Sequence, residues 1–320
     1  MYYASFKSIG AYIPNEVRDN KWFIDRMDTS DEWITKRTGI KERRIALDDE
    51  NTSDLGFKAG QIAIKRANLE NKDIDLIITA TISPDYMNMP STSCLIAEKL
   101  GIKDVMAFDI SAACTGFIYA LSVAKAFIES GMKKNVLIIG AEKLSNIVDY
   151  TDRTTCMLFG DGAGAAVISA TTNKDEAIID INCSADGSQK DLLLTPGIQS
   201  GEKAFMKMKG NETFKVAVRT LTSDVKNILE RNNYKIEDID LFVPHQANYR
   251  IIKAVGDALK FEDKQKVLTV EKYGNTSSAS IPMAINDCFE SKRLTNGQTL
   301  LLDAFGGGLT WGSAILKFNG

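Results

Sequence analysis

Two pairs of repeated segments restrict the folds that are open to this chain. The segment KDIDLII at residues 72–78 recurs as EDIDLFV at residues 237–243, and FGDGAGAAVIS at 159–169 is echoed by FGGGLTWGSAIL at 305–316. Each copy of the first segment follows an amphipathic helical stretch and ends in an apolar run that predicts a buried strand. Because both pairs occur in the same order, we favour an internal duplication over a chance likeness of common segments.

The segments between these markers also correspond. Residues 105–127 and 266–289 each predict a strand, a tight turn and a helix. Strands that alternate with helices in this way predict an α/β protein with largely buried sheets. We expect two halves, residues 1–170 with a candidate nucleophilic cysteine and residues 171–320 with a histidine and an asparagine.

Charge and cysteine content argue against several classes of protein. The net charge of −3 argues against a general nucleic-acid binder. The five cysteines contain no C-x-x-C pair, so zinc and redox motifs are unsupported. The N-terminal stretch lacks the features of a signal peptide, and no apolar run approaches the roughly 18–20 residues of a membrane span. We therefore expect a cytoplasmic protein with no metal, no nucleic-acid partner and no membrane segment.

Cys114 lies where a predicted strand meets a predicted buried helix. Small residues fill the turn before it, and the following stretch is apolar on every face. Unpaired backbone N–H groups and the helix dipole favour a thiolate there, so we expect its pKa to fall below about 8.5. This context favours a nucleophile over a small buried hydrophobe, the structural role that we assign to Cys94, Cys156, Cys183 and Cys288.

His245, the only histidine of the chain, directly follows the second copy of the repeated strand. Pro244 ends the strand's pairing, and a predicted helix opens just after the histidine. The imidazole therefore emerges at the carboxyl edge of a strand, where α/β proteins place their sites. A lone histidine is more often structural, but this position favours a functional one.

The second half contributes two further candidate features. Asn275 lies in the turn that corresponds to the Cys114 turn, where an asparagine could equally be a turn or helix-cap residue. Three consecutive glycines at residues 306–308 let backbone N–H groups approach a ligand, as an oxyanion hole requires. No glycine-rich segment has the spacing of a phosphate or dinucleotide loop, so we expect no nucleotide cofactor.

Taken together, these segments resemble the thiolase superfamily and, more closely, the β-ketoacyl-acyl-carrier-protein synthase III family. The resemblance covers nearly the whole chain and implies a five-layered αβαβα architecture of two duplicated βαβαβαββ halves. It rests on six segments in the right order: DTSDEWITKRTGIKERR, AACTGFIYAL, FGDGAGAAVI, VPHQANYRII, YGNTSSASIP and AFGGGLTWGSA.

The family's catalytic triad falls on Cys114, His245 and Asn275, and its oxyanion hole on the N–H groups of Cys114 and Gly307. Related enzymes need other residues. Elongating ketosynthases use a Cys-His-His triad, which a chain with one histidine cannot supply. Thiolases use a second cysteine where this chain has FGGG, and plant-type polyketide synthases share the triad but are longer.

The resemblance also implies contacts with substrates and partners. Trp33, Arg37 and Arg153 match positions that contact the adenine end of coenzyme A, Asn248 one that contacts its pantetheine arm, and Phe305 an aromatic beside the nucleophile. Met89 lies in the loop that shapes the primer pocket through a dimer partner, where bacterial relatives often have Phe. Candidates for the acidic face of a carrier protein are Gln246, Arg250, Lys253 and Lys215, although Lys253 and Lys215 taken singly also fit solvated helix flanks.

The implied reaction begins fatty acid synthesis. An acyl-CoA primer, expected to be acetyl-CoA, acylates Cys114, and decarboxylation of malonyl-acyl carrier protein then gives a 3-oxoacyl-acyl carrier protein. The coenzyme A thioester is a substrate, no metal or redox cofactor is expected, and the family implies a homodimer.

Three alternatives stay open. Cys, His and Asn in this order, with spacings of 131 and 30 residues, also fit a papain-like cysteine hydrolase. A non-catalytic acyl-CoA-binding or scaffolding relative is the second. The third is a family member that uses longer or branched primers or serves secondary metabolism.

Overall fold

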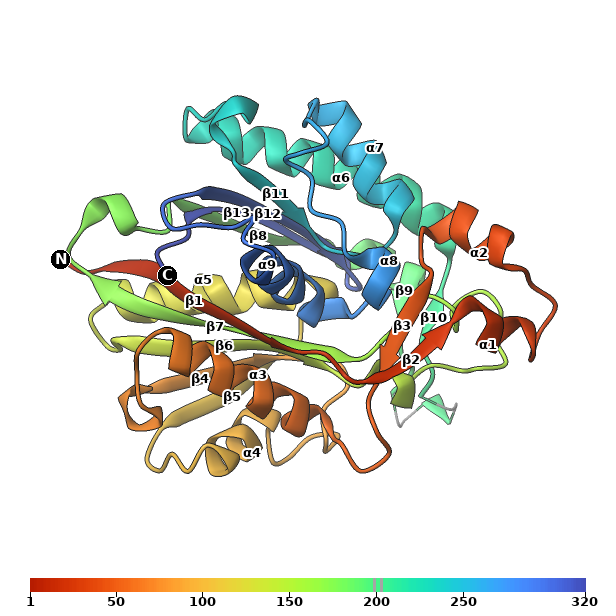
Figure 1. Cartoon of the computed structure of the whole chain (residues 1–320), viewed down its shortest axis with the longest axis horizontal. Coiled ribbons are helices and arrows are strands. Elements are labelled where there is room, and N and C mark those ends of the chain that lie inside the picture. Colours follow the sequence, from red (N-terminus) through yellow and green to blue (C-terminus); the bar gives the residue numbers. More distant parts are fainter. Residues whose placement is uncertain (198–199, 202–203) are drawn as a thin grey trace.

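The computed structural model describes residues 1–197, 200–201 and 204–320. Two main sheets lie one above the other with helices between them (Figure 1). The first has the strand order β1-β7-β6-β4-β5 and the second the order β11-β12-β13-β8. Their strands are β1 (Tyr3–Tyr12), β4 (Leu76–Ala80), β5 (Met106–Ile110), β6 (Asn135–Glu142), β7 (Gly162–Thr171), β8 (Asp180–Ala185), β11 (Leu241–Pro244), β12 (Thr299–Gly306) and β13 (Thr310–Lys317).

Helices and two small ribbons complete the chain. The ribbons pair β2 (Glu16–Asp19) with β3 (Glu42–Ile45) and β9 (Leu193–Leu194) with β10 (Lys207–Met208). The α-helices are α1 (Asn20–Ile24), α2 (Asp31–Thr38), α3 (Thr52–Arg66), α4 (Thr92–Lys99), α5 (Gly116–Glu129), α6 (Gly210–Arg231), α7 (Tyr249–Leu259), α8 (Val270–Tyr273) and α9 (Ser280–Glu290).

The layers confirm the fold class expected from the sequence. From bottom to top, Figure 1 shows α3 and α4, the first sheet, α5 and α9, the second sheet, and α6 and α7, which is the αβαβα order. The first half runs β1-α3-β4-α4-β5-α5-β6-β7, the expected βαβαβαββ sequence of elements. Both glycine-rich repeats lead into strands, β7 and β13, as predicted.

The second half departs from the repeat at one strand. Residues 266–269, predicted to form a strand, make only an isolated parallel bridge between Lys266 and Phe242. The side-chain amide of Gln246 bonds to the backbone of this segment. Its Nε2 donates to Val267 O, and its Oε1 accepts from Thr269 N. Backbone groups bonded to a side chain are not available for a strand ladder, so among the described residues this sheet has four strands and the first has five.

The central helix layer explains the apolar character of the stretch after Cys114. Phe117, Ile118 and Leu121 on α5 are fully buried in a core cluster that also takes side chains from the second sheet. Each such side chain contributes roughly 1.5–3 kcal/mol by burial. Because this cluster joins both halves, they share one core, and the division at residue 170 stays a prediction.

The turns that open α5 and α9 have matching backbones. Ala113 and Ser277, three residues before the first residue of each helix, adopt left-handed φ angles of 47° and 48°. The turn before α9 packs closely on β6, since a Cβ atom on Gly140 would lie 2.3 Å from Ser278 O, and it meets the other turn where a Cβ atom on Gly116 would lie 3.5 Å from Ser278 Cβ. This agreement supports the duplication, and the close approach places the two turns at the candidate site.

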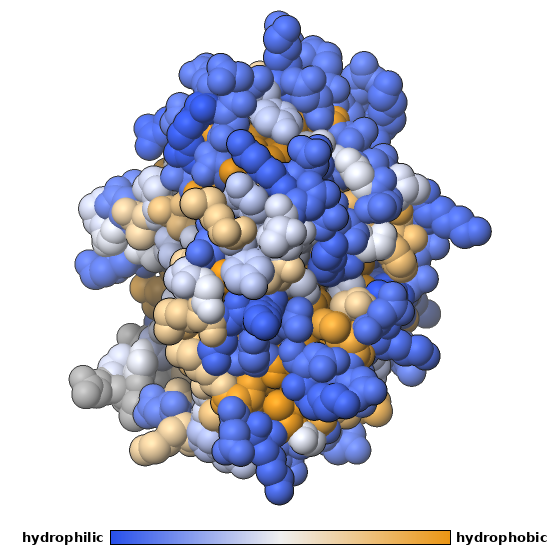
Figure 2. All heavy atoms as spheres, turned by 90° about the vertical axis from the view of Figure 1, so that its left-hand side faces the viewer, coloured by the Kyte–Doolittle hydropathy of each residue, from blue (hydrophilic) through white to orange (hydrophobic). Residues whose placement is uncertain are grey.

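The outer surface carries most of the polar residues. Figure 2 shows that the face at the left of Figure 1 is mainly hydrophilic, with apolar residues gathered in its lower half. Within the ranges that the structure describes, no helix combines the length and apolar character required to cross a bilayer.

Candidate active site

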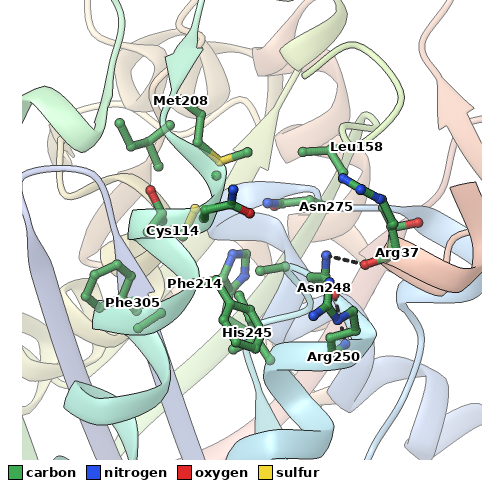
Figure 3. Close-up of a pocket in the computed structure, with 18 of the residues that line it drawn as sticks. Arg37, Cys114, Leu158, Met208, Phe214, His245, Asn248, Arg250, Asn275 and Phe305 are labelled. Carbon is green, nitrogen blue, oxygen red and sulfur yellow. Dashed lines mark hydrogen bonds between the residues drawn. The ribbon is translucent and has the colours of Figure 1, made fainter. Parts of the chain in front are cut away.

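Two cavities meet at the Cys114 side chain. The smaller, of about 230 Å³, is also lined by His245, Asn275 and Phe305. Figure 3 shows these side chains converging at one end of the cavity, with Arg37 and Arg250 toward the other. The larger cavity, of about 820 Å³, lies along Tyr86–Asn88 and Leu193–Gly197 and also contacts Gly307. The sulfur therefore lies between two separate spaces.

Cys114 lies in a 3-10 turn that leads directly into α5, and 6% of the residue is exposed. Burial raises the pKa of its thiol to about 12. The lowered pKa expected from the helix terminus is therefore wrong, because removal of water from the sulfur outweighs the backbone contributions. At neutral pH the residue is a thiol.

His245 follows the last residue of β11, and its backbone N–H donates to Asp303 O on the neighbouring strand at 2.7 Å. Its Nδ1 lies 2.6 Å from the Ser280 hydroxyl. That hydroxyl also accepts from the backbone N–H of Gln246 at 3.3 Å and has its own proton to donate to Nδ1. With Nδ1 as the acceptor, the proton of the neutral ring lies on Nε2, and burial keeps the ring neutral by lowering its pKa to about 3.

Asn275 is held by its backbone and by one side-chain oxygen. Its N–H donates to Leu158 O at 2.8 Å, and its carbonyl accepts from Gly160 N at 3.0 Å. Its Oδ1 accepts from Ser277 N at 2.8 Å, the turn bond that the sequence left as an alternative. The same side chain lines the smaller cavity, where its amide group is available to donate.

The terminal glycines lie against the Cys114 turn. A Cβ atom on Gly306 would be 2.8 Å from Cys114 N, so only glycine fits at this contact. Gly307, the predicted partner of Cys114 in the oxyanion hole, lines the larger cavity together with Cys114. The glycine-rich segment is therefore adjacent to the nucleophile candidate, as the sequence predicted.

Aromatic and cationic side chains gather at the open end of the smaller cavity. The guanidinium groups of Arg37 and Arg153 lie 4.7 and 4.8 Å from the Trp33 ring centroid. Asn248 caps α7 through its side chain and donates its Nδ2 to Arg37 O at 3.1 Å (Figure 3). Arg250 lies 5.2 Å from the Phe214 ring centroid. This opening of the smaller cavity, its mouth, is positively charged, and the Trp33 ring provides a flat aromatic surface there.

Several predicted contact residues lie elsewhere. Gln246 is 1% exposed and uses its amide inside the protein, so its assignment to a carrier-protein surface is wrong. Met89 is 83% exposed and does not line the larger cavity of its own chain. Lys215 is exposed on α6, and exposed Lys253 pairs with Asp257 at 2.5 Å. The structural assignment of Cys94 as a buried residue is also wrong, because it is exposed.

Two buried serines belong to the site although the sequence analysis did not identify them. Ser280 contacts the imidazole, and Ser277 lines the larger cavity beside Cys114. Serines are common in turns and at helix starts, so a single sequence does not distinguish these from capping residues. In the described part of the chain, no group of three or more His, Cys, Asp or Glu side chains could hold a metal ion.

The layered fold, with a cysteine in one of two matching turns that open buried helices, is that of the thiolase-fold enzymes. Family models described as 3-oxoacyl-(acyl-carrier-protein) synthase III and its C-terminal part match residues 108–187 and 229–318. The chain belongs to the β-ketoacyl-acyl-carrier-protein synthase III family and is an acyltransferase-type condensing enzyme.

Individual relatives support this membership over the full chain. The β-ketoacyl-acyl-carrier-protein synthases III of Aliarcobacter butzleri and Sulfurimonas denitrificans are each 65% identical, over 99% and 100% of this chain and 98% and 99% of theirs. The crystal structure of 3-oxoacyl-acyl-carrier-protein synthase III from Aquifex aeolicus has a TM-score of 0.94 at 45% identity, covering 98% of this chain and all of that one.

Proposed function

We propose that this enzyme condenses an acyl-CoA primer, with acetyl-CoA as the preferred one, with malonyl-acyl carrier protein. The product is a 3-oxoacyl-acyl carrier protein, the first intermediate of fatty acid synthesis. The observation that carries the proposal is the meeting of Cys114, His245 and Asn275 at one end of a single cavity. Relatives that are 57–65% identical to this chain over its whole length are named β-ketoacyl-acyl-carrier-protein synthase III, and this supports the same substrates.

The first half-reaction transfers the acyl group to Cys114. The sulfur attacks the thioester carbonyl, the S–C bond to coenzyme A breaks, and the proton of the Cys114 thiol ends on the released coenzyme A. Backbone N–H groups of Cys114 and Gly307 stabilise the tetrahedral oxyanion. The small residues and glycines around the sulfur leave room for that oxygen.

The second half-reaction uses His245 and Asn275. The Nε2–H of the neutral imidazole and the amide of Asn275 donate to the malonyl thioester oxygen, where negative charge develops as CO₂ leaves. The carbanion attacks the acyl carbonyl, and the Cys114 sulfur leaves and takes up a proton. Neither half-reaction requires a metal or a redox cofactor, and coenzyme A enters only as a thioester substrate.

Substrate arms enter through the charged mouth of the smaller cavity. We assign the adenine end of coenzyme A to Trp33, Arg37 and Arg153, the pantetheine arm to Asn248, and the space beside the nucleophile to Phe305. The exposed side chains of Arg250, Lys215 and Lys253 present positive charge to an acidic carrier protein. This charge complementarity favours fast association more than tight binding.

A homodimer in the cytoplasm is part of the proposal. Strand β5 has a neighbour on one side only, β4, and the other edge of Met106–Ile110 is at least partly exposed. An unpaired edge strand is a template for pairing with another chain. The exposed loop that carries Met89 would then reach the partner's primer cavity. Light scattering that gives twice the chain mass supports this arrangement, and a monomer contradicts it.

The larger cavity favours a second candidate within the same family, an enzyme that accepts longer or branched primers. Its volume of about 820 Å³ exceeds the space that an acetyl group needs. Turnover across a panel of straight and branched acyl-CoA primers with malonyl-acyl carrier protein separates the two candidates. Equal or faster turnover of longer primers would favour the second.

The main test separates the half-reactions. We expect Cys114→Ser to abolish transfer of a radiolabelled acyl group to the protein. We expect His245→Ala to lower release of CO₂ from malonyl-acyl carrier protein by about 10²–10³-fold, the cost of one donor to a developing oxyanion, with a smaller effect on acylation. Normal decarboxylation by His245→Ala would contradict the role of the imidazole.

A further inference from the structure

Glu142 is a fully buried carboxyl group that the proposed reaction does not use. It ends β6, and its Oε2 accepts from the hydroxyls of Ser83 at 2.6 Å and Thr81 at 3.1 Å and from Ile82 N at 3.1 Å. Burial raises the pKa of this carboxyl in spite of these donors. Such a group is neutral, or it is a buried charge that needs a partner.

The hydroxyl of Ser278 distinguishes the two forms. Its Oγ lies 2.8 Å from Ala80 O and 2.9 Å from Glu142 Oε1. A hydroxyl has one proton, so it donates to only one of these oxygens at a time. Ala80 O has no proton to give. Both contacts are hydrogen bonds only if Glu142 Oε1 donates to Ser278 Oγ, which in turn donates to Ala80 O.

This network lies beside the sulfur. Ser278 directly follows Ser277, which lines the larger cavity together with Cys114. Burial raises the pKa of the Cys114 thiol, the Ser277 hydroxyl lowers it, and a negative charge on Glu142 raises it further and so opposes the thiolate. A neutral Glu142 removes that opposition.

Other ionisable groups near Glu142 point away from it. The Lys143 ammonium donates to backbone carbonyls of residues 47, 48 and 50. Asp161, next to the β7 residue that pairs with Glu142, accepts from Ala46 N and from Ser145. Asp85 bonds to the start of α3. Cys114 is therefore the titratable group to which the state of Glu142 matters.

We propose that Glu142 carries a proton in the resting enzyme and, as a neutral acid, holds the Ser277–Ser278 turn beside Cys114 without placing a negative charge near the sulfur. It is a positioning residue, because it touches the turn and not the substrate. That the Cys114 sulfur is the nucleophile rests on the proposed function. That the proton lies on Glu142 rests on the hydrogen bonds alone.

Glu142→Gln tests the proton directly, since its NH₂ group can donate to Ser278 Oγ and its oxygen can accept the three donors of Oε2; only the long 3.5 Å contact from Ser278 N to Oε1 is lost. We expect the rate of iodoacetamide labelling of Cys114 at pH 7 to stay within about twofold of the parent, because no charge is lost. The rate is read on the Cys114 peptide, with Cys114→Ser as background. Glu142→Ala leaves buried donors unpaired, and we expect about tenfold slower acyl transfer, rescued in Glu142→Gln.

Infrared difference spectra give a readout that a purely structural role would not produce. We expect Glu142→Gln to lose the carbonyl stretch of a protonated carboxyl, and Ser278→Ala to shift that band. Glu50→Gln is the matched control: Glu50 is buried and pairs with Lys58 at 2.5 Å, so its substitution should remove a carboxylate band.

A rise of about tenfold or more in the labelling rate of Cys114 at pH 7 in Glu142→Gln, or loss of a carboxylate band, would overturn the proposal. Because Ser278→Ala keeps Glu142, its spectrum decides the matter even if Glu142→Gln does not fold. Acyl transfer by Cys114→Ser would instead contradict the proposed function and leave the infrared result unaffected.

Discussion

Asn275 uses the two ends of its side-chain amide differently. Its Oδ1 accepts the N–H of Ser277 at 2.8 Å and so holds the turn, while its NH₂ group is left to donate in the cavity. His245 is arranged in the same way, with Nδ1 engaged by Ser280 and Nε2 left for a ligand. In both residues one polar atom secures the geometry and the other is free for chemistry.

Asn275→Asp separates these two functions. The new carboxylate can still accept from Ser277 N, so the turn is kept, but its burial without a countercharge should lower the melting temperature as pH rises. It cannot donate, and it repels the malonyl carboxylate, so we expect CO₂ release to fall by about 10²–10³-fold. Both are measured on the same preparation, with acyl transfer to Cys114 as the control. Undiminished CO₂ release would show that the amide donor is not used.

At the scale of single residues, the sequence predicted the positions of Cys114, His245 and Asn275 but not their environments. The pKa of Cys114 could not be predicted because burial depends on side chains distant in sequence. Gln246 was assigned to a carrier-protein surface from the family resemblance, whereas its amide is needed inside by residues 267–270. Hydrogen-bond partners that come from other elements leave no local pattern.

At the scale of elements, the repeated segments predicted strands such as β4 and β11 and helices such as α5 and α9, whereas β1, β6 and β12 were not identified. The segment 266–269 was predicted wrongly, because its β-branched and apolar residues suit a strand but its backbone groups bond to a side chain. The contact between the end of β6 and the turn before α9 could also not be predicted from the sequence. It depends on Gly140, whose missing side chain lets Ser278 O approach.

Gly140→Ala should disrupt that contact between elements. The new Cβ would lie 2.3 Å from Ser278 O and 2.7 Å from Ser278 C, both backbone atoms that cannot rotate away. We expect a loss of about 1–3 kcal/mol in the free energy of unfolding, as for other overpacked sites. Gly187→Ala is the control, because a Cβ atom there would have no other atom within 4 Å. Equal urea midpoints for the two variants would contradict this contact.

At the scale of the whole molecule, stability depends on carboxyl groups buried without countercharges. Asp303 on β12 is 0% exposed, and neither of its oxygens has a partner within the described residues. Burial, and then the nearby Asp224, raise its pKa well above the usual value. The native state therefore keeps a proton that the unfolded chain releases above about pH 4, so the free energy of unfolding falls as pH rises through this range.

Asp303→Asn removes this dependence. We expect the variant to gain stability over the parent as pH increases from about 5 to about 8, with the gain limited to about 1.4 kcal/mol per pH unit. Urea unfolding at both pH values measures it. Asp54→Asn should lose stability by the same amount at both pH values, because Asp54 pairs with Lys99 and its lowered pKa leaves it ionised in the folded and the unfolded chain across this range. A gain for Asp303→Asn that is the same at both pH values would contradict the assignment.

The position of Cys114 between two cavities has a kinetic consequence. An acyl group carried on the sulfur can extend into the larger cavity, while coenzyme A and the arm of the carrier protein must both use the smaller one. Two occupants of one passage exclude each other, so the first product has to depart before the second substrate can arrive. The enzyme is thereby built for a ping-pong order, with free coenzyme A competing against the malonyl donor and not against the acyl group already in place.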